Sequence, residues 1–505
     1  MIKILVIHSI FLLTSINCFS KIEIDKKPNH YLLFVHGLAG TGDTFGEMPN
    51  TLTKHLSQHD RSFQFRPYTF SYHTEDDTLN TYEFAFQLAD FILEALPRLN
   101  KEDKISFITH SQGGVISSIL IFNSFAGIEG HIAQYTQNID SFITLGTPFW
   151  GSKLADIISH PTDPLEYLIK ENRETLLPRA GLTQLKEMSL FSDTIRVFRN
   201  SLLDMDKEFM KRMFSQVKVL NIGGIANIEK LTRKYKATFQ PSGLTSVLPF
   251  VFGGQFEYEA DTAVSLPSSR LDSIYVNDIK FNYTENNITP ADYSIETSFA
   301  DFIPIYGIHA SPTADRFLDI AFLPETMCTK TIVNCDHPSY EIIYNFMTGK
   351  SIKNHKNAID KNTLAGFTLS FDIALDEQYK DLLEDIEVTM METSRTSTYP
   401  HGHPIGVEIE INKSLEYRAS SVYVDTDHDK KSFHYTGAFH YSNSDILSTN
   451  EITKNRILRI QKNIHKNGAY LTFKVELDGF KTRFVKVLVK PLKSSFINLN
   501  LEPRH

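Results

Sequence analysis

Short, continuous runs of apolar residues recur through the first two thirds of the chain. The clearest of these runs are Tyr31–Val35, Phe63–Tyr72, Ile105–Ile108, Ser141–Leu145, Val217–Ile222 and Phe302–Tyr306. Between them, Thr81–Leu96 carries apolar side chains at helical spacing. Continuous apolar runs are typical of parallel strands buried on both faces, and their alternation with helical segments indicates an α/β domain. We therefore expect a mainly parallel sheet with helices on both faces, within residues 28–352.

The pattern changes after about residue 355. Apolar and polar residues alternate in four segments, 367–375, 405–411, 469–479 and 484–492. Such alternation is typical of antiparallel strands that bury one face and expose the other. Helix signals are few in this part of the chain. The pattern predicts a C-terminal, all-β, sandwich-like domain over residues 360–505, which is close to the usual size of a domain.

The first twenty residues are typical of a secretory signal peptide. Lys3 gives a positive start, an apolar run extends from Ile4 to Ile16, and a polar stretch ends the segment. The apolar run is too short to span a bilayer comfortably. We expect residues 1–20 to direct the chain out of the cytoplasm, either to the periplasm or to the medium. The alternative is a lipoprotein that is cleaved before a lipid-modified Cys18.

Charge and cysteine content narrow the possible partners. The formal net charge of -9 leaves no basic surplus to bind the phosphates of nucleic acid. Cys328 and Cys335 lie close together in the sequence, and in an oxidising compartment we expect them to form a disulfide. The alternative is a metal-binding pair, although no second pair of ligands with zinc-like spacing accompanies it. The sequence gives no sign of an obligate protein partner.

The segment that begins at Ile105 has the order strand, sharp turn, helix. Its turn reads Thr-His-Ser-Gln-Gly-Gly, with Ser111 in the third place. A strained strand-to-helix turn of the type Gly-x-Ser-x-Gly lifts the serine hydroxyl above the sheet. Thr109 stands where the first glycine is expected, whereas Gly113 and Gly114 leave room for the helix to approach the strand. Ser111 is therefore a candidate nucleophile, and an ordinary serine in a turn is the alternative.

Two further motifs follow strands in the same way. Val35–Gly40 reads VHGLAG, and Phe142–Asp156 reads FITLGTPFWGSKLAD. Together the three motifs resemble those of the α/β-hydrolase superfamily, in particular its extracellular triacylglycerol lipases and inositol-deacylase-like serine esterases. The resemblance covers residues 30–350 or so and implies a serine hydrolase on the α/β-hydrolase fold. It also implies an oxyanion hole formed by the backbone N–H groups of Leu38 and Gln112.

The acid of a catalytic triad is assigned through the same resemblance. Asp261 begins a segment, DTAVSLPS, that is similar to the Asp-Gly-x-Val segment holding the family's triad acid. Thr262 replaces the usual glycine. Glu257 and Glu259 are the competing acids in this part of the chain.

Two histidines are candidates for the catalytic base. His309 directly follows an uninterrupted apolar strand, so it is expected at the carboxyl edge of the sheet, and we favour it. His337 is the alternative, because it precedes a predicted final helix. His36 and His110 flank the glycine turns, and we expect them to support these loops rather than to act as the base.

The segment after the Gly-Ser turn is a candidate wall of the substrate site. Pro161 and Pro164 interrupt any helix there, so a mobile lid is expected at residues 155–180. Residues 182–202 carry apolar side chains at helical spacing. These residues predict either a wall that binds the acyl chain or helices packed against the sheet, and the pattern favours packed helices.

Three aspartates, Asp425, Asp427 and Asp429, stand at alternate positions near the C-terminal strands. Carboxylates spaced in this way can bind calcium through their oxygens. An EF-hand would require glycine and glutamate where Lys430 and Thr436 stand. We favour the alternative of a charged hairpin turn and expect no metal ion.

Taken together, these features predict a secreted serine hydrolase that cleaves carboxylic esters, above all those of lipids. Ser111 would attack the ester carbonyl, His309 would take its proton, and Asp261 would orient the imidazole. This chemistry needs no metal ion or organic cofactor. A thioesterase or an amidase would use the same triad. A second hypothesis, from a different class, is a non-catalytic secreted protein on a degenerate hydrolase scaffold that binds a surface or membrane.

Overall fold

The structure of the protein is a computed structural model. The residues that it describes are 27–96, 98–128, 130–161, 167, 170–171, 179–204, 207–225, 259–261, 263–277, 294–306, 309, 338–353, 355–356, 358–391, 409–411, 421–425, 427, 429–441 and 465–504. The predicted signal peptide, all three cysteines, Glu257 and His337 lie outside these residues. The predicted disulfide and the alternative base therefore remain predictions.

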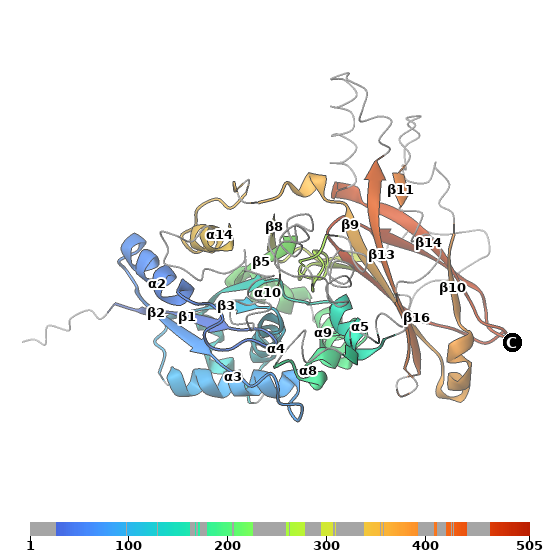
Figure 1. Ribbon diagram of the computed structural model, residues 1–505, viewed down its shortest axis with the longest axis horizontal. Coiled ribbons are helices and arrows are strands. Elements are labelled where there is room, and N and C mark those ends of the chain that lie inside the picture. The colour runs from blue at the N-terminus through green and yellow to red at the C-terminus, as the bar shows by residue number, and fades with distance from the viewer. Residues whose placement is uncertain are drawn as a thin grey trace, which may run out of the picture.

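A six-stranded sheet forms the N-terminal part of the molecule (Figure 1). In spatial order its strands are β2 (Gln64–Phe70), β1 (Asn29–Val35), β3 (Lys104–His110), β4 (Ile139–Leu145), β5 (Lys218–Ile225) and β8 (Asp301–Tyr306). Every neighbouring pair is parallel. The predicted α/β class and all six predicted strands are confirmed.

Helices cover both faces of this sheet. The side chains of β1 show why the strands of the sheet are continuous apolar runs in the sequence. Leu33 packs in a core with α3 (Thr81–Ala95) and α4 (Gln112–Ala126). Its neighbours Leu32 and Phe34 point the opposite way, into a second core with α2 (Met48–His59) and α14 (Pro338–Met347). Successive side chains of a strand alternate between faces, so burial of both faces requires an unbroken apolar run.

Among the described residues, several helices lie between β4 and β5. They are α5 (Lys153–Ser159), α8 (Leu182–Glu187), α9 (Asp193–Asp204) and α10 (Lys207–Gln216). In Figure 1, α5, α8 and α9 lie between the parallel sheet and the C-terminal strands. Leu185, Met188 and Phe198 are buried in the core that also holds α3 and α4. Residues 182–202 therefore form packed helices, as the pattern favoured, whereas most of the predicted lid lies outside the described residues.

Two further sheets form the C-terminal part of the molecule (Figure 1). The larger sheet contains β11 (Ile409–Ile411), β12 (Ser421–Asp425), β13 (Lys430–Tyr441), β9 (Gly366–Ala374), β16 (Ser494–Asn500), β6 (Ser273–Asn277) and β7 (Ser294–Glu296). The smaller sheet contains β10 (Glu387–Met391), β14 (Ala469–Glu476) and β15 (Arg483–Val489). Side chains from both sheets share one apolar core, to which Phe371 and Phe473 contribute. This is the predicted sandwich-like arrangement.

The larger sheet differs from the sequence prediction in three ways. It is mixed rather than antiparallel, because β16 pairs in parallel with both β9 and β6. Strands β6 and β7 come from within residues 28–352, so this part of the chain contributes to the larger sheet as well as to the six-stranded parallel sheet. The prediction of a half-buried pattern is also wrong for β9, whose polar face is buried as well. Thr368, Ser370 and Asp372 lie on that face, and each is hydrogen bonded.

Helix α9 explains this burial, because it joins the two parts of the molecule. Arg196 binds Asp425 at 2.7 Å, and Arg199 forms an ion pair with Asp372. All four side chains are almost completely buried. The guanidinium of Arg199 also stacks on the ring of Phe496 in β16. Asp425 is therefore engaged in an ion pair, and the described residues contain no cluster of potential ligands that could hold a metal ion.

A helix that spans a membrane needs about 20 predominantly apolar residues. Within the described ranges, no helix is long and apolar enough to cross a bilayer.

Candidate active site

Ser111 occupies a strained turn between β3 and α4. Its backbone has φ 53° and ψ -128°, a conformation that residues with a side chain rarely adopt. The turn is held by main-chain hydrogen bonds, from the Ser111 N–H to the oxygen of Leu145 at 3.0 Å and from the Gly114 N–H to the oxygen of Ser111 at 2.9 Å. A strained serine at the start of a helix is the geometry of a nucleophile elbow.

The glycines of this turn are required by close packing. A Cβ atom on Gly113 would overlap the main-chain oxygen of His36, and one on Gly114 would overlap the side chain of Thr147. Thr109, which replaces the first glycine of the motif, has room for its side chain. Its hydroxyl donates to the oxygen of Ile143 on the neighbouring strand at 3.2 Å. The departure from the family's pattern therefore leaves the turn intact.

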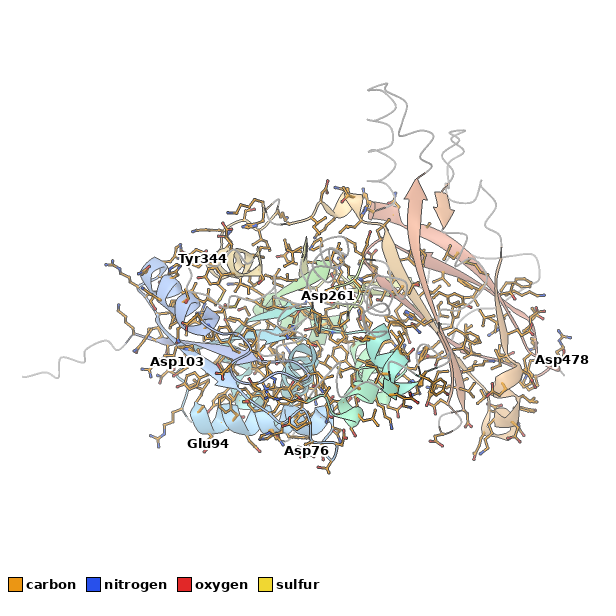
Figure 2. All side chains as sticks on the ribbon, viewed as in Figure 1. Asp76, Glu94, Asp103, Asp261, Tyr344 and Asp478 are labelled. Carbon is orange, nitrogen blue, oxygen red and sulfur yellow. The ribbon has the colours of Figure 1, made fainter. Side chains whose placement is uncertain are left out.

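Three side chains that the sequence singled out lie in a hydrogen-bonded row. Ser111 Oγ is 2.7 Å from His309 Nε2, and His309 Nδ1 is 2.8 Å from Asp261 Oδ2. A carboxylate only accepts, so Nδ1 carries the proton toward Asp261 and Nε2 is free to accept the proton of the serine. Asp261 is 2% exposed and lies near the middle of the molecule in Figure 2. This row has the geometry of a nucleophile, a base and the acid that orients the base.

Asp261 is held in place by its own loop. Its Oδ1 atom accepts the N–H groups of Ala263 at 3.1 Å and Val264 at 2.8 Å, which leaves Oδ2 for His309. The competing acid Glu259 is used differently, because its two oxygens accept the N–H groups of Ala365 at 2.8 Å and Gly366 at 3.0 Å. Burial raises the pKa of the Glu259 carboxyl. Glu259 thus connects the loop of Asp261 to the start of β9.

The Gly-Thr-Pro-Phe-Trp-Gly-Ser motif packs against the same loop. Ser152 Oγ donates to the oxygen of Ala263 at 2.6 Å, and Ser268 Oγ donates to the oxygen of Gly151 at 2.5 Å. Gly146, at the end of β4, has φ 55°. A Cβ atom on this glycine would lie 2.7 Å from Asp261 Oδ2 and 3.0 Å from His309 Nδ1. The motif therefore shapes the space in which the acid and the base meet.

Two backbone contacts fix the main chain of His309. Its N–H donates to the oxygen of Asp261 at 2.8 Å, and its own oxygen accepts from His110 Nε2 at 2.9 Å. Burial, followed by the proximity of His309, lowers the pKa of His110 well below its usual range. His110 is therefore neutral and acts as a hydrogen-bond donor. This geometry agrees with the expectation that His110 supports the site and does not act as the base.

Leu38 and Gln112, the residues predicted to form an oxyanion hole, lie on segments next to Ser111. The loop after β1 is so close to the nucleophile that a Cβ atom on Gly37 would overlap the Cβ of Ser111. The N–H groups of Leu38 and Gln112 belong to this loop and to the first residue of α4. The two N–H groups therefore belong to segments that adjoin Ser111, as an oxyanion hole requires.

Tyr72 supports this loop and was missed by the sequence motifs. Its hydroxyl donates to the main-chain oxygen of His36 at 2.9 Å, and its N–H donates to His36 Nε2 at 3.2 Å. The rings of the two residues stack with their centroids 4.3 Å apart. The Nδ1 atom of His36 donates to the oxygen of Gly37 at 2.9 Å. Burial lowers the pKa of His36 to about 4, so this imidazole is neutral near pH 7.

The parallel sheet and the strained serine turn are those of the α/β-hydrolase fold. Residues 25–181 match the model of a family described as "Putative serine esterase (DUF676)", which indicates a hydrolase of the serine esterase type. No curated protein sequence matches the chain.

Solved structures with the same fold include two of phospholipase PlaB from Legionella pneumophila. One aligns with 16% identity and a TM-score of 0.56, over 94% of this chain and 94% of the other. The second, in complex with thio-NAD, aligns with 16% identity and a TM-score of 0.54 over the same shares. The mature lipase BlEst2 from Bacillus licheniformis is 20% identical, with a TM-score of 0.32, over 48% of this chain and 80% of that lipase. Likeness at such low identity concerns the fold alone.

Proposed function

We propose that this protein is a serine hydrolase that cleaves carboxylic esters through Ser111, His309 and Asp261. The observation that carries the proposal is the hydrogen-bonded row in which His309 Nε2 lies 2.7 Å from Ser111 Oγ and His309 Nδ1 lies 2.8 Å from Asp261 Oδ2. A base within 3.2 Å of a serine hydroxyl, itself oriented by a carboxylate, is the arrangement that nucleophilic acyl transfer needs.

In the first half of the reaction, Ser111 Oγ forms a bond to the ester carbonyl carbon while His309 Nε2 takes the hydroxyl proton. The carbonyl π electrons move to the oxygen, and the resulting oxyanion accepts hydrogen bonds from the N–H groups of Leu38 and Gln112. Asp261 stabilises the imidazolium that forms. The tetrahedral intermediate then collapses, and the alcohol leaves with the proton from His309. The product of this half is an ester between the acyl group and Ser111.

In the second half, water attacks the acyl-enzyme. His309 takes a proton from the water, and the new oxyanion occupies the same hole. Collapse of this intermediate returns the proton to Ser111 Oγ and releases the carboxylic acid. The enzyme is restored, and residues of the chain carry every proton transfer and stabilise the oxyanion, so these steps call on no metal ion or cofactor.

Lipid esters are the proposed substrates, and an extracytoplasmic location is part of the proposal. The apolar N-terminal segment, Ile4 to Ile16, supports export of the chain. The fold shared with a protein described as a phospholipase supports the choice of phospholipid and acylglycerol esters for the first assays. Contact with a lipid surface follows from such a substrate.

The test is hydrolysis of p-nitrophenyl butyrate, p-nitrophenyl palmitate and phosphatidylcholine vesicles by the purified mature protein. We expect Ser111→Ala to lose activity by at least about a thousandfold. Ser124→Ala is the matched control, because it removes a buried hydroxyl from the far end of the same helix, where it bonds the oxygen of Leu120 at 2.6 Å. Equal activity in wild type and Ser111→Ala would refute the triad. Activity on butyrate alone would refute the lipid substrate and leave the esterase.

A further inference from the structure

Thr74 is a completely buried residue that contacts the loop of the proposed oxyanion hole. Its hydroxyl oxygen accepts the N–H of Ala39, the residue after Leu38, at 3.0 Å. The same hydroxyl donates to the main-chain oxygen of Arg179 at 2.7 Å, and the main-chain oxygen of Thr74 accepts the N–H of Gly181 at 2.9 Å. A hydroxyl has a single proton, so the bond to Arg179 fixes its direction and leaves a lone pair for Ala39.

Ala39 needs such a contact because its backbone is strained. Residues 37–40 form a turn closed by the N–H of Gly40 and the oxygen of Gly37 at 3.0 Å. Ala39 is the third residue of this turn and has φ 59°. A positive φ at that position is typical of a type II turn and favours glycine over any residue with a Cβ. Rotation of the peptide between Leu38 and Ala39 would relieve the strain and would break the bond to Thr74.

The position of this loop matters for the chemistry on Ser111. The backbone at Gly37 packs against Ser111 without room for a Cβ atom, so a movement of the loop changes where the Leu38 N–H lies relative to the nucleophile. Donors in an oxyanion hole act on charge that develops in the transition state. Misplacing one of them therefore lowers kcat and leaves KM largely unchanged.

We propose that Thr74 is a positioning residue for the oxyanion hole, acting through the N–H of Ala39 on the placement of Leu38. This inference rests on the proposed function, because Leu38 is a donor only in that reaction. Thr74 also binds Arg179 and Gly181, so it connects the loop to the segment that leads into α8. Thr74 itself touches none of the reacting atoms.

Replacing Thr74 by valine and by serine tests the proposal. Valine keeps the shape of the side chain but removes the hydroxyl, whereas serine keeps the hydroxyl. We expect Thr74→Val to lower kcat on p-nitrophenyl butyrate by about 10- to 100-fold, with KM changed by less than about threefold. Thr74→Ser should stay within about threefold of wild type. A trifluoromethyl ketone inhibitor, which forms an oxyanion on the serine, should bind Thr74→Val more weakly by the same factor as the loss in kcat/KM.

The matched control is Thr368→Val, which removes another buried threonine hydroxyl. That hydroxyl lies 2.8 Å from Ser494 Oγ in the C-terminal sheet, away from the oxyanion loop. The Thr368→Val variant should have a changed thermal unfolding midpoint and the kcat of wild type. Folded Thr74→Val with wild-type kcat would overturn the proposal, as would a loss in Thr74→Ser equal to that in Thr74→Val. Ser111→Ala, run in parallel, separates the two claims, because full activity in that variant would refute the proposed function itself.

Discussion

His110 Nε2 donates a hydrogen bond to the main-chain oxygen of His309, 2.9 Å away. The residue just before the candidate nucleophile therefore holds the backbone of the candidate base, although 198 positions separate Ser111 from His309 in the chain. The contact explains why a histidine next to the serine is useful without being the base. The contact therefore joins the turn of the candidate nucleophile directly to the backbone of the candidate base.

Replacing His110 should weaken catalysis without preventing substrate binding. In His110→Ala the oxygen of His309 loses its donor, and the imidazole gains freedom to leave the line between Ser111 and Asp261. We expect kcat for p-nitrophenyl butyrate to fall about 10- to 100-fold, because small misplacements of catalytic groups cost that much. His110→Gln, which retains a donor, should lose less. Steady-state kinetics of the two variants would contradict the role of His110 if both matched wild type.

Gly146 should tolerate no side chain. A Cβ atom there would lie 2.7 Å from Asp261 Oδ2, between the groups that form the acid–base hydrogen bond. Gly146→Ala should therefore lower kcat by at least about 100-fold. Gly127→Ala is the control, since Gly127 has φ 73° and nothing lies within 4 Å of its added Cβ. The control carries the backbone strain alone and should keep wild-type kcat in the same assay.

Acid should destabilise the fold through buried histidines. Burial is the main cause that lowers the pKa of His36, and that of His30, to about 4. Above pH 6.5 both imidazoles are neutral in the folded and unfolded chains and have no effect. As the pH falls from 6.5 to 4, the unfolded chain binds protons that the folded chain does not. The free energy of unfolding should therefore decrease, by about 3 kcal/mol for each histidine once the pH is below 4.

Urea unfolding at a series of pH values between 7 and 4 measures this effect. His30→Gln removes one titrating group outside the site, where His30 Nε2 lies 2.7 Å from Ser106 Oγ. This variant should lose less stability than wild type over the same pH range. An identical pH dependence in the two proteins would contradict the assignment to His30.

The ion pair between Arg199 and Asp372 should be costly to break. Both side chains are about 95% buried, so Arg199→Leu leaves a buried carboxylate that keeps the Ser432 hydroxyl, at 2.7 Å, and the more distant charge of Arg196. Removing one partner of a buried pair typically costs about 3 to 5 kcal/mol. The single tryptophan, Trp150, packs on Phe496 with ring centroids 4.9 Å apart, so its fluorescence reports unfolding at this junction.

Asp372→Asn added to Arg199→Leu should recover much of the lost stability, because the unpaired charge is removed. Lys481→Ala breaks an exposed pair with Glu502 and should cost less than about 1 kcal/mol. A similar small loss in Arg199→Leu would show that the pair contributes little to the junction.

Much of the fold could be predicted from the sequence because its signals are local. An unbroken apolar run such as Tyr31–Val35 specifies a strand buried on both faces, and the order of strand, turn and helix around Ser111 specifies an elbow. The pairing of β6 with β16 could not be predicted, since it joins residues more than 200 positions apart. For the same reason, nothing local to β9 revealed that Asp372 is buried against Arg199.

In the candidate site, too, residues with a local sequence signal could be predicted and residues without one could not. Ser111 and His309 each follow an apolar strand, and Asp261 stands in a recognisable segment, so motifs were enough to select them. The supporting residues Tyr72 and Thr74 act through backbone atoms of a distant loop and have no pattern of their own. An aromatic residue at the end of the second strand was the only local signal for Tyr72.

The most direct test of the central claim is to trap the nucleophile. The mature protein is treated with a fluorophosphonate, which bonds covalently to an activated serine, and the modified peptide is identified by mass spectrometry. We predict a single adduct on Ser111, with labelling abolished in Ser111→Ala and strongly slowed in His309→Ala. Ester hydrolysis that continues while Ser111 stays unmodified, or an adduct on another residue, would contradict the account.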